Sequence, residues 1–201
     1  SSWRGLWLVA HCWGVIALAM LMGVLWPVTI PLAVMIIGTR QLGLFILMHD
    51  AAHGLLHPNR RINDAVAHWL CSSSLGEYRP YHLQHHAKTW TKHDPDIGLV
   101  LPFPITPASL RRKVWRDLSG QTGRKFVRGA WKRSIARWRA GDEDGRRAFV
   151  GFLATNGVLF ALLAALGHPL LYLLWAGAWL TTNTLVTRIR SIAEHAMVPD
   201  P

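Results

Sequence analysis

Four long apolar blocks constrain the fold of this chain more than any other feature of its sequence. They cover about residues 6–26, 28–48, 148–166 and 170–187, and only the second contains a charged residue, Arg40. A helix of about 20 apolar residues spans the hydrocarbon core of a bilayer. Helices of a soluble bundle normally keep a polar face, which these blocks lack. The pattern therefore predicts an all-α integral membrane protein with four transmembrane helices rather than a soluble bundle.

The connection between the second and third blocks is long and strongly basic. Of the 22 Lys and Arg residues, 13 lie in residues 111–147, against four acidic residues. Loops rich in Lys and Arg stay in the cytoplasm, and the interleaved Trp115, Trp131 and Trp138 suit a segment lying on anionic lipid. No nucleic-acid recognition fold fits between the spans, so we expect no nucleic acid as a partner. The membrane is predicted to be a bacterial inner membrane. Residues 49–147 and both termini are predicted to face the cytoplasm.

Two histidine clusters begin where the second apolar block ends. "HDAAH" covers residues 49–53 and "HLQHH" covers residues 82–86. Residues three or four apart share one face of a helix, so each cluster can direct its imidazoles at one point. Neutral imidazole binds Fe, Zn, Cu or Ni, and a site without thiolates suits redox iron better than structural zinc. We therefore predict a histidine-rich helical cap on the cytosolic side that binds metal.

Other histidines are assigned individually. His57 lies one further turn along from His53, but the helix is expected to end about there because Pro58 disfavours helical geometry at the residue before it. His57 is therefore left open as a ligand or an outer partner. His93, in "HDPD", is left open as a ligand or part of a polar loop. The remaining histidines are expected to be structural: His11, His68 and His168.

Carboxylates accompany both clusters. Asp50 follows His49, while Asp94 and Asp96 follow the second cluster. A metal-bound imidazole usually donates its other N–H to such a group, which fixes its tautomer and orientation. Asp50 is predicted to be an outer partner of this kind, whereas Asp94 and Asp96 are left open between that role and solvated loop acids.

The order of four spans, "HDAAH", "HLQHH" and "RIRSIAEHAMVPD" resembles the membrane fatty acid desaturase superfamily, from about Ile36 to the end. The resemblance implies two irons at the cytosolic ends of extended helices, which activate O2 and desaturate an acyl-lipid or acyl-thioester. It implies a ferredoxin-like or cytochrome b5-like electron donor. The ligands that it implies are His49, His53, His82, His85, His86 and His195.

The sequence departs from the family pattern in two ways. The family carries a third HxxHH box after the fourth span, and the sequence stops at Pro201 without one. We therefore expect residues 1–201 to form a single desaturase-like domain that lacks its C-terminal part and is inactive in this form. The family pattern also leads us to expect an asparagine four residues before His195. Ser191 takes that place, as an outer residue of the metal site.

Two alternatives remain at this level. A carotenoid ketolase or hydroxylase, or an alkane hydroxylase, would share the same histidine boxes, because a fold does not fix a reaction. A metal transporter or sensor would use clustered histidines without redox chemistry. Transport sites usually lie near the bilayer midplane, where this chain offers only His11 and Arg40 within its spans.

Overall fold

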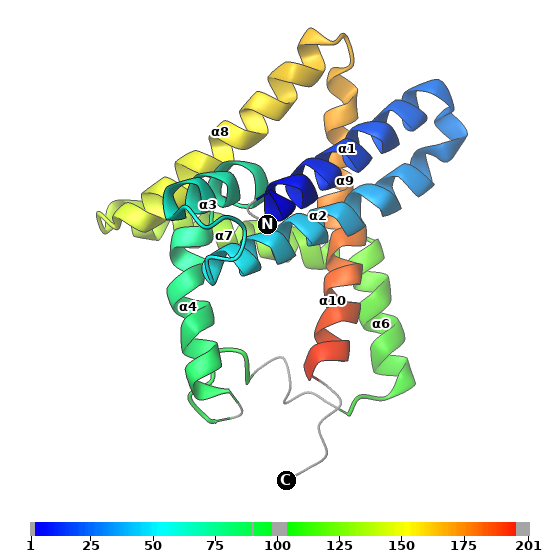
Figure 1. Ribbon diagram of the computed structural model, residues 1–201. Helices are drawn as coiled ribbons and strands as arrows, with labels where there is room; N and C mark the ends of the chain where they lie inside the picture. Colours follow the sequence, from blue (N-terminus) through cyan, green and yellow to red (C-terminus); the bar gives the residue numbers. More distant parts are fainter. Residues whose placement is uncertain (1–2, 90, 98–103, 196–201) are drawn as a thin grey trace.

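The structure is a computed structural model that describes residues 3–89, 91–97 and 104–195, except for the side chain of His195. Within those ranges it is helical and contains no strand (Figure 1). The helices, in chain order, are α1 (Arg4–Leu25), η1 (Pro27–Thr29), α2 (Ile30–Ala52), α3 (Arg60–Val66), η2 (Ala67–Cys71), α4 (Leu75–Lys88), α6 (Pro107–Leu118), α7 (Gln121–Arg139), α8 (Glu143–Ala165), η3 (Pro169–Leu171), α9 (Tyr172–Leu180) and α10 (Thr182–His195).

Three helical segments are long and apolar enough to cross a membrane. They are Arg4–Leu25, Pro27–Ala52 and Glu143–Ala165, and they coincide with three of the predicted spans. Helix α8 leaves most of its apolar surface uncovered, including Phe152 and Phe160. A contiguous apolar surface of this kind marks a contact with lipid or with another protein. For the described residues the prediction of an all-α chain is confirmed, with three helices that are candidates for membrane spans.

The fourth predicted span, residues 170–187, does not form one helix. It is divided among η3, α9 and the start of α10, with a break at Thr181, where φ is −121° and ψ is −83°. The hydroxyl of Thr181 donates to Gly177 O at 2.6 Å, and that of Thr182 donates to Val34 O of α2 at 2.8 Å. Threonine hydroxyls that bond backbone carbonyls compete with the helical pattern, which accounts for a break in this polar run.

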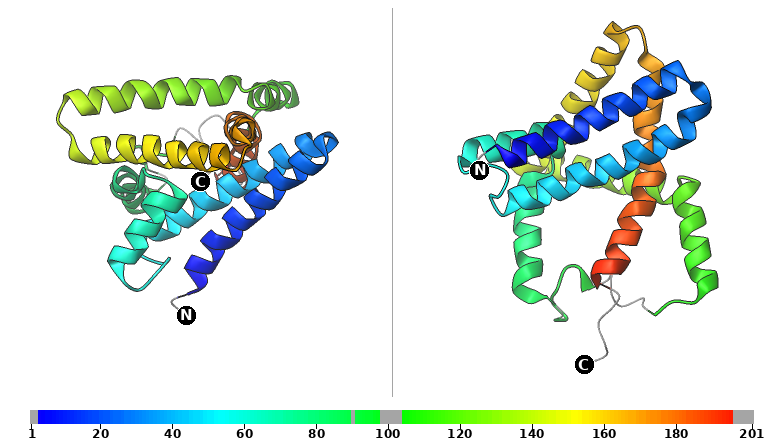
Figure 2. Two further views of the ribbon diagram at one scale, coloured as in Figure 1. Left: turned by 90° about the horizontal axis from the view of Figure 1, so that it is seen from above. Right: turned by 45° about the vertical axis from the view of Figure 1, so that its right-hand side comes forward.

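Helix α2 is the centre of the molecule. Helix α1 packs along the length of α2. Helices α9 and α10 cross α2, and α4 contacts the end that carries His49 (Figures 1 and 2). Among the fully buried side chains are Ile16 of α1 and Ile37, Leu44 and Met48 of α2. The turns that join α1 to α2 and α8 to α9 lie away from the C-terminal ends of α4 and α10 (Figure 1).

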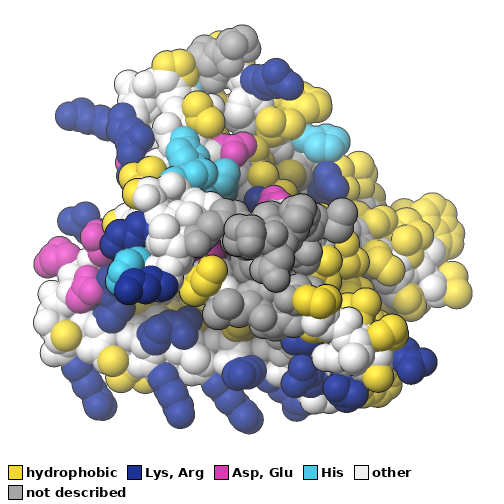
Figure 3. Space-filling view, turned by 90° about the horizontal axis from the view of Figure 1, so that it is seen from below, with side chains coloured by type: hydrophobic (Ala, Val, Ile, Leu, Met, Phe, Trp, Pro, Cys, Tyr) yellow, Lys and Arg dark blue, Asp and Glu magenta, His cyan; other side chains and the backbone are white. Residues whose placement is uncertain are grey.

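The basic connection forms helices α6 and α7. Helix α7 packs against α8, with the Trp131 and Phe149 rings 5.2 Å apart, and turns into α8 at Gly141, whose φ is +73°. Glycine suits this left-handed position because it has no Cβ. Arg124, Arg128 and Lys132 lie together along one side of α7. Seen from below, Lys and Arg side chains form a row along one edge of the molecule (Figure 3).

An ion pair fixes α6 to α10. The Arg188 guanidinium donates from Nε and Nη2 to the two carboxylate oxygens of Asp117, at 2.5 and 2.8 Å. Asp117 is fully buried. A paired guanidinium and carboxylate make two parallel hydrogen bonds, which define orientation as well as distance. Helix α10, which ends at His195, is thereby attached to α6.

Candidate metal centre

The C-terminal end of α2 supplies the first two histidines. His49 lies on the last turn of α2, and His53 follows its last residue, with the two rings 5.3 Å apart. The prediction that this helix continues to about His57 is wrong, because it ends at Ala52. Gly54, with φ of +79°, adopts the left-handed conformation that commonly terminates helices. His49 and His53 remain neighbours at i and i+4, although the helix ends earlier than predicted.

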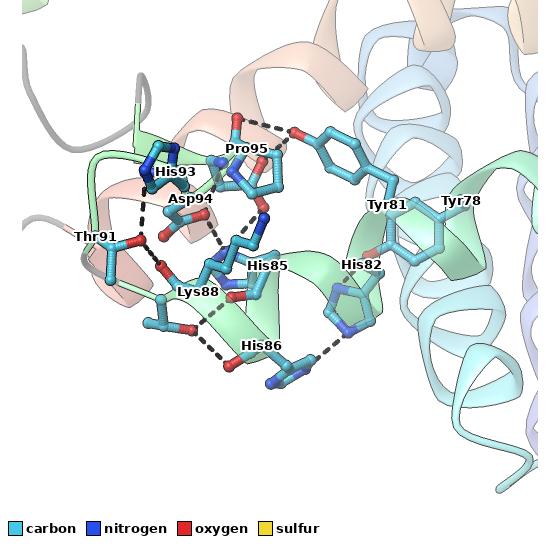
Figure 4. A network of polar contacts seen from close by, with 12 residues as sticks. Tyr78, Tyr81, His82, His85, His86, Lys88, Thr91, His93, Asp94 and Pro95 are labelled. Carbon is cyan, nitrogen blue, oxygen red and sulfur yellow. Dashed lines mark hydrogen bonds and ion pairs between the residues drawn. The ribbon is translucent and has the colours of Figure 1, made fainter.

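Helix α4 supplies the second cluster, because "HLQHH" lies within it. His82 and His86 are one turn apart, while His85 points toward the loop that follows the helix (Figure 4). His82 is buried, and the Tyr78 ring stacks on it at 5.1 Å with its hydroxyl 3.3 Å from Nδ1. Tyr78 therefore fixes the plane of the His82 imidazole.

Four imidazoles from the two helices converge. One nitrogen from each of His49, His53, His82 and His86 lies within 4.8 Å of the other three. Nε2 of His82 is 2.9 Å from Nε2 of His53 and 2.9 Å from Nε2 of His86. We call these four residues the histidine cluster.

The spacing of these nitrogens suits a shared metal ion better than a hydrogen-bond network. A neutral ring nitrogen carries either one proton or one lone pair, so Nε2 of His82 makes one well-aligned hydrogen bond, as donor or as acceptor, and not two. Two nitrogens that each ligate one ion at about 2.1 Å, and at right angles, lie about 3.0 Å apart. The donor set therefore fits a transition metal that accepts imidazole.

Electrostatics favour the neutral, metal-binding form of the two histidines that α4 contributes to the cluster. Burial, together with the neighbouring imidazoles, lowers the pKa of His82 to about 4. The same causes lower the pKa of His86. Histidine ligates metal in its neutral form, so His82 is in the binding form at neutral pH.

Carboxylates contact the histidines of both helices. Nδ1 of His49 lies 3.1 Å from Asp50 Oδ1. Nδ1 of His85 lies 2.7 Å from Asp94 Oδ1 and 3.5 Å from Asp96 Oδ2 (Figure 4). Asp94 is buried and its Oδ1 accepts a bond from Asp96 N, so the alternative of a solvated loop acid is wrong for Asp94. Such contacts leave Nε2 of the imidazole with its lone pair.

A model of the fatty acid desaturase family matches residues 24–201, which contain the whole histidine cluster. The chain belongs to the fatty acid desaturase family. A stretch of 63 residues is also 41% identical to the β-carotene ketolase of Paracoccus sp. (strain PC1). That stretch covers 29% of this chain and only 26% of the ketolase. No solved structure matches the chain.

Among the described residues of this desaturase-family chain, the predicted site residues His57, His93 and Ser191 lie outside the histidine cluster. Nδ1 of His57 accepts a bond from Asn59 N at 3.0 Å and so supports the turn before α3. His93 is exposed in the loop after α4, and Ser191 is partly buried on α10. The helical backbone ends at His195, whose side chain lies outside the described residues.

Sequence reasoning missed the residues that support the cluster. Tyr78 precedes His82 by one turn, and this i, i+4 spacing was a signal that could have revealed it. Arg79, Asn63 and Asp64 gave no such signal, because their partners lie on other helices.

Proposed function

We propose that this protein is a membrane oxidoreductase that introduces a double bond into a fatty acyl chain, using O2 and an external electron donor. The observation that supports this best is the convergence of four imidazoles in a chain of the fatty acid desaturase family. The acyl chain would come from an acyl-lipid or acyl-thioester. The donor would be a ferredoxin-like or cytochrome b5-like protein.

The proposed cofactor is a pair of irons. The histidine cluster would provide His49, His53, His82 and His86, while His85 and His195 would serve the second iron, with His57 and His93 as further ligand candidates. Asp50 would orient His49, and Ser191 would lie in the outer shell. When bound, the irons supply O2 activation and hydrogen abstraction from an unactivated C–H. Metal transport is less well supported, because the cluster lies at helix ends rather than at the middle of a span.

For the membrane topology we propose four crossings, with α9 and the first part of α10 together making the fourth. Reporter fusions within residues 119–121, between α6 and α7, and after Pro201 should both report the cytoplasm of a bacterial cell. The basic helices resist translocation, and an even number of crossings returns the chain to its starting side. A periplasmic signal from the first fusion would contradict this topology and the cytosolic location of the histidine cluster.

A second candidate function is the ketolation of a carotenoid ring. The local identity to the β-carotene ketolase favours it. Both substrates are long and apolar and would reach the site from the bilayer, and both reactions need the same metal and O2. The family therefore does not separate them.

Product analysis distinguishes the two functions. The complete gene would be expressed, with a competent electron donor, in a bacterium that makes β-carotene, and fatty acyl chains and carotenoids would be analysed by chromatography and mass spectrometry. We expect a new acyl alkene that is absent with the matched His82→Ala variant. A ketone or alcohol on the carotenoid would support the second function instead. If protein with its metal in place forms neither product, both proposed functions are contradicted.

A further inference from the structure

Arg79 of α4 reaches the end of α2. It lies one turn before His82, and its guanidinium donates from Nε to Ala52 O and from Nη2 to Ala51 O, both at 3.1 Å. The last four carbonyls of a helix have no amide partner within the helix, and a cation there also interacts favourably with the helix dipole. Arg79 therefore binds the end of the helix that carries His49 and His53.

The same guanidinium is held on its other side by α3. Nη2 and Nη1 donate to the two oxygens of Asp64, at 2.6 and 3.1 Å. Burial opposes ionisation of Asp64, but the hydrogen bonds and charge of Arg79 outweigh it and lower the pKa of this carboxyl. The paired fork fixes both the position and the plane of the guanidinium.

Asn63 attaches α3 to the end of α2 directly. It is fully buried, its Nδ2 donates to Ala51 O at 2.9 Å, and its Oδ1 accepts from Leu56 N at 3.1 Å. Helix α3 and the end of α2 thus form one rigid unit, and Arg79 joins α4 to that unit. Ala51 O accepts from both Asn63 and Arg79, so the two attachments meet at one atom.

We propose that Arg79 is a positioning residue that sets the register between the two halves of the histidine cluster. This inference rests on the proposed metal centre. His82 and His86 lie on the same helix as Arg79, three and seven residues further along. The Phe45–Tyr78 ring contact and the Ser74–Met48 contact also join α2 to α4. Neither fixes orientation as a forked, charged hydrogen-bond set does.

The test uses the purified full chain in detergent, with Co²⁺ as the probe. Arg79→Gln should weaken Co²⁺ binding by about 10-fold or more, the size expected for an outer partner of a ligand, and should change the ligand-field spectrum. Arg60→Gln is the matched control, because Arg60 also pairs with Asp64, with Nε 3.4 Å from Oδ2. It should bind Co²⁺ like the unmodified protein. Equal affinity and spectra for Arg79→Gln and the unmodified protein would overturn the proposal.

A second measurement follows the relative position of the two halves of the histidine cluster in the absence of metal. Spin labels at Leu55 and Leu83, both exposed, would be placed in a background with Cys12 and Cys71 replaced by alanine. Arg79→Gln should broaden the label-to-label distance distribution, and an unchanged distribution would refute the role of Arg79. If the unmodified protein fails to bind Co²⁺ while Arg79→Gln still broadens the distance distribution, the metal centre fails and the positioning role stands.

Arg79→Lys covers the case in which Arg79→Gln does not fold. Lysine keeps the charge but cannot make the planar fork that bonds Asp64 and the α2 carbonyls together. We expect its Co²⁺ affinity to fall below that of the unmodified protein. Full affinity in this variant would mean that charge alone is sufficient and would overturn the proposal.

Discussion

His82→Ala is expected to abolish metal binding at the histidine cluster. His82 is the central member, because its Nε2 lies 2.9 Å from a nitrogen of His53 and of His86. Its removal deletes one ligand and also the residue through which the α2 and α4 halves meet. We expect the affinity for Fe²⁺ to fall by more than about 100-fold, beyond the range seen for outer partners. Iron content after purification and Fe²⁺ titration would measure the loss.

Two further substitutions make this result specific. His85 contacts Asp94 and Asp96 instead of the histidine cluster, so His85→Ala should retain one iron of the proposed two. His168→Ala, in the exposed turn between α8 and α9, should leave the iron content unchanged. If all three variants lost iron equally, the loss would reflect general unfolding, and the assignment of His82 as a central ligand would be contradicted.

Much of this site could be predicted from local spacing. The i, i+4 relation places His49 near His53 and His82 near His86 wherever the backbone is helical, and the structure is helical or just past a helix end at these positions. The contact between the two pairs is a tertiary contact between helices. It depends on Arg79, Asn63 and Asp64, whose partners lie 12 to 28 residues away, and periodicity carries no information on such pairs.

The fold shows the same division between local and tertiary causes. Long apolar runs identified the segments that hold α1, α2 and α8, because the spanning requirement is a property of composition and length. The apolar run at residues 170–187 has the same composition, yet it is broken. The break follows from threonine hydroxyls that bond backbone carbonyls and from a close approach to α2, neither of which hydropathy can report.

That close approach occurs at Gly38, and it leads to a second strong prediction. A Cβ added to Gly38 would collide with Thr182 Oγ1 and lie 2.8 Å from Asn183 N. Gly38→Ala is therefore expected to lower the midpoint of thermal unfolding in detergent, because backbone and a buried, hydrogen-bonded threonine must move. Overpacking of this kind typically lowers the free energy of unfolding by about 1–3 kcal/mol. We expect a loss at the upper end of this range, because the added Cβ contacts backbone.

The matched control is Gly14→Ala on α1, where an added Cβ would meet nothing within 4 Å. Alanine is favoured over glycine within a helix by about 1 kcal/mol, so this variant should be neutral or more stable. The same gain applies at Gly38, so the cost of the collision is the net loss measured there plus this gain of about 1 kcal/mol. Equal midpoints for the two variants would mean that α2 and α10 do not cross this closely. The crossing matters for function because it seats α10, whose other end carries His195. Gly38→Ala should therefore also reduce the iron content, whereas Gly14→Ala should not.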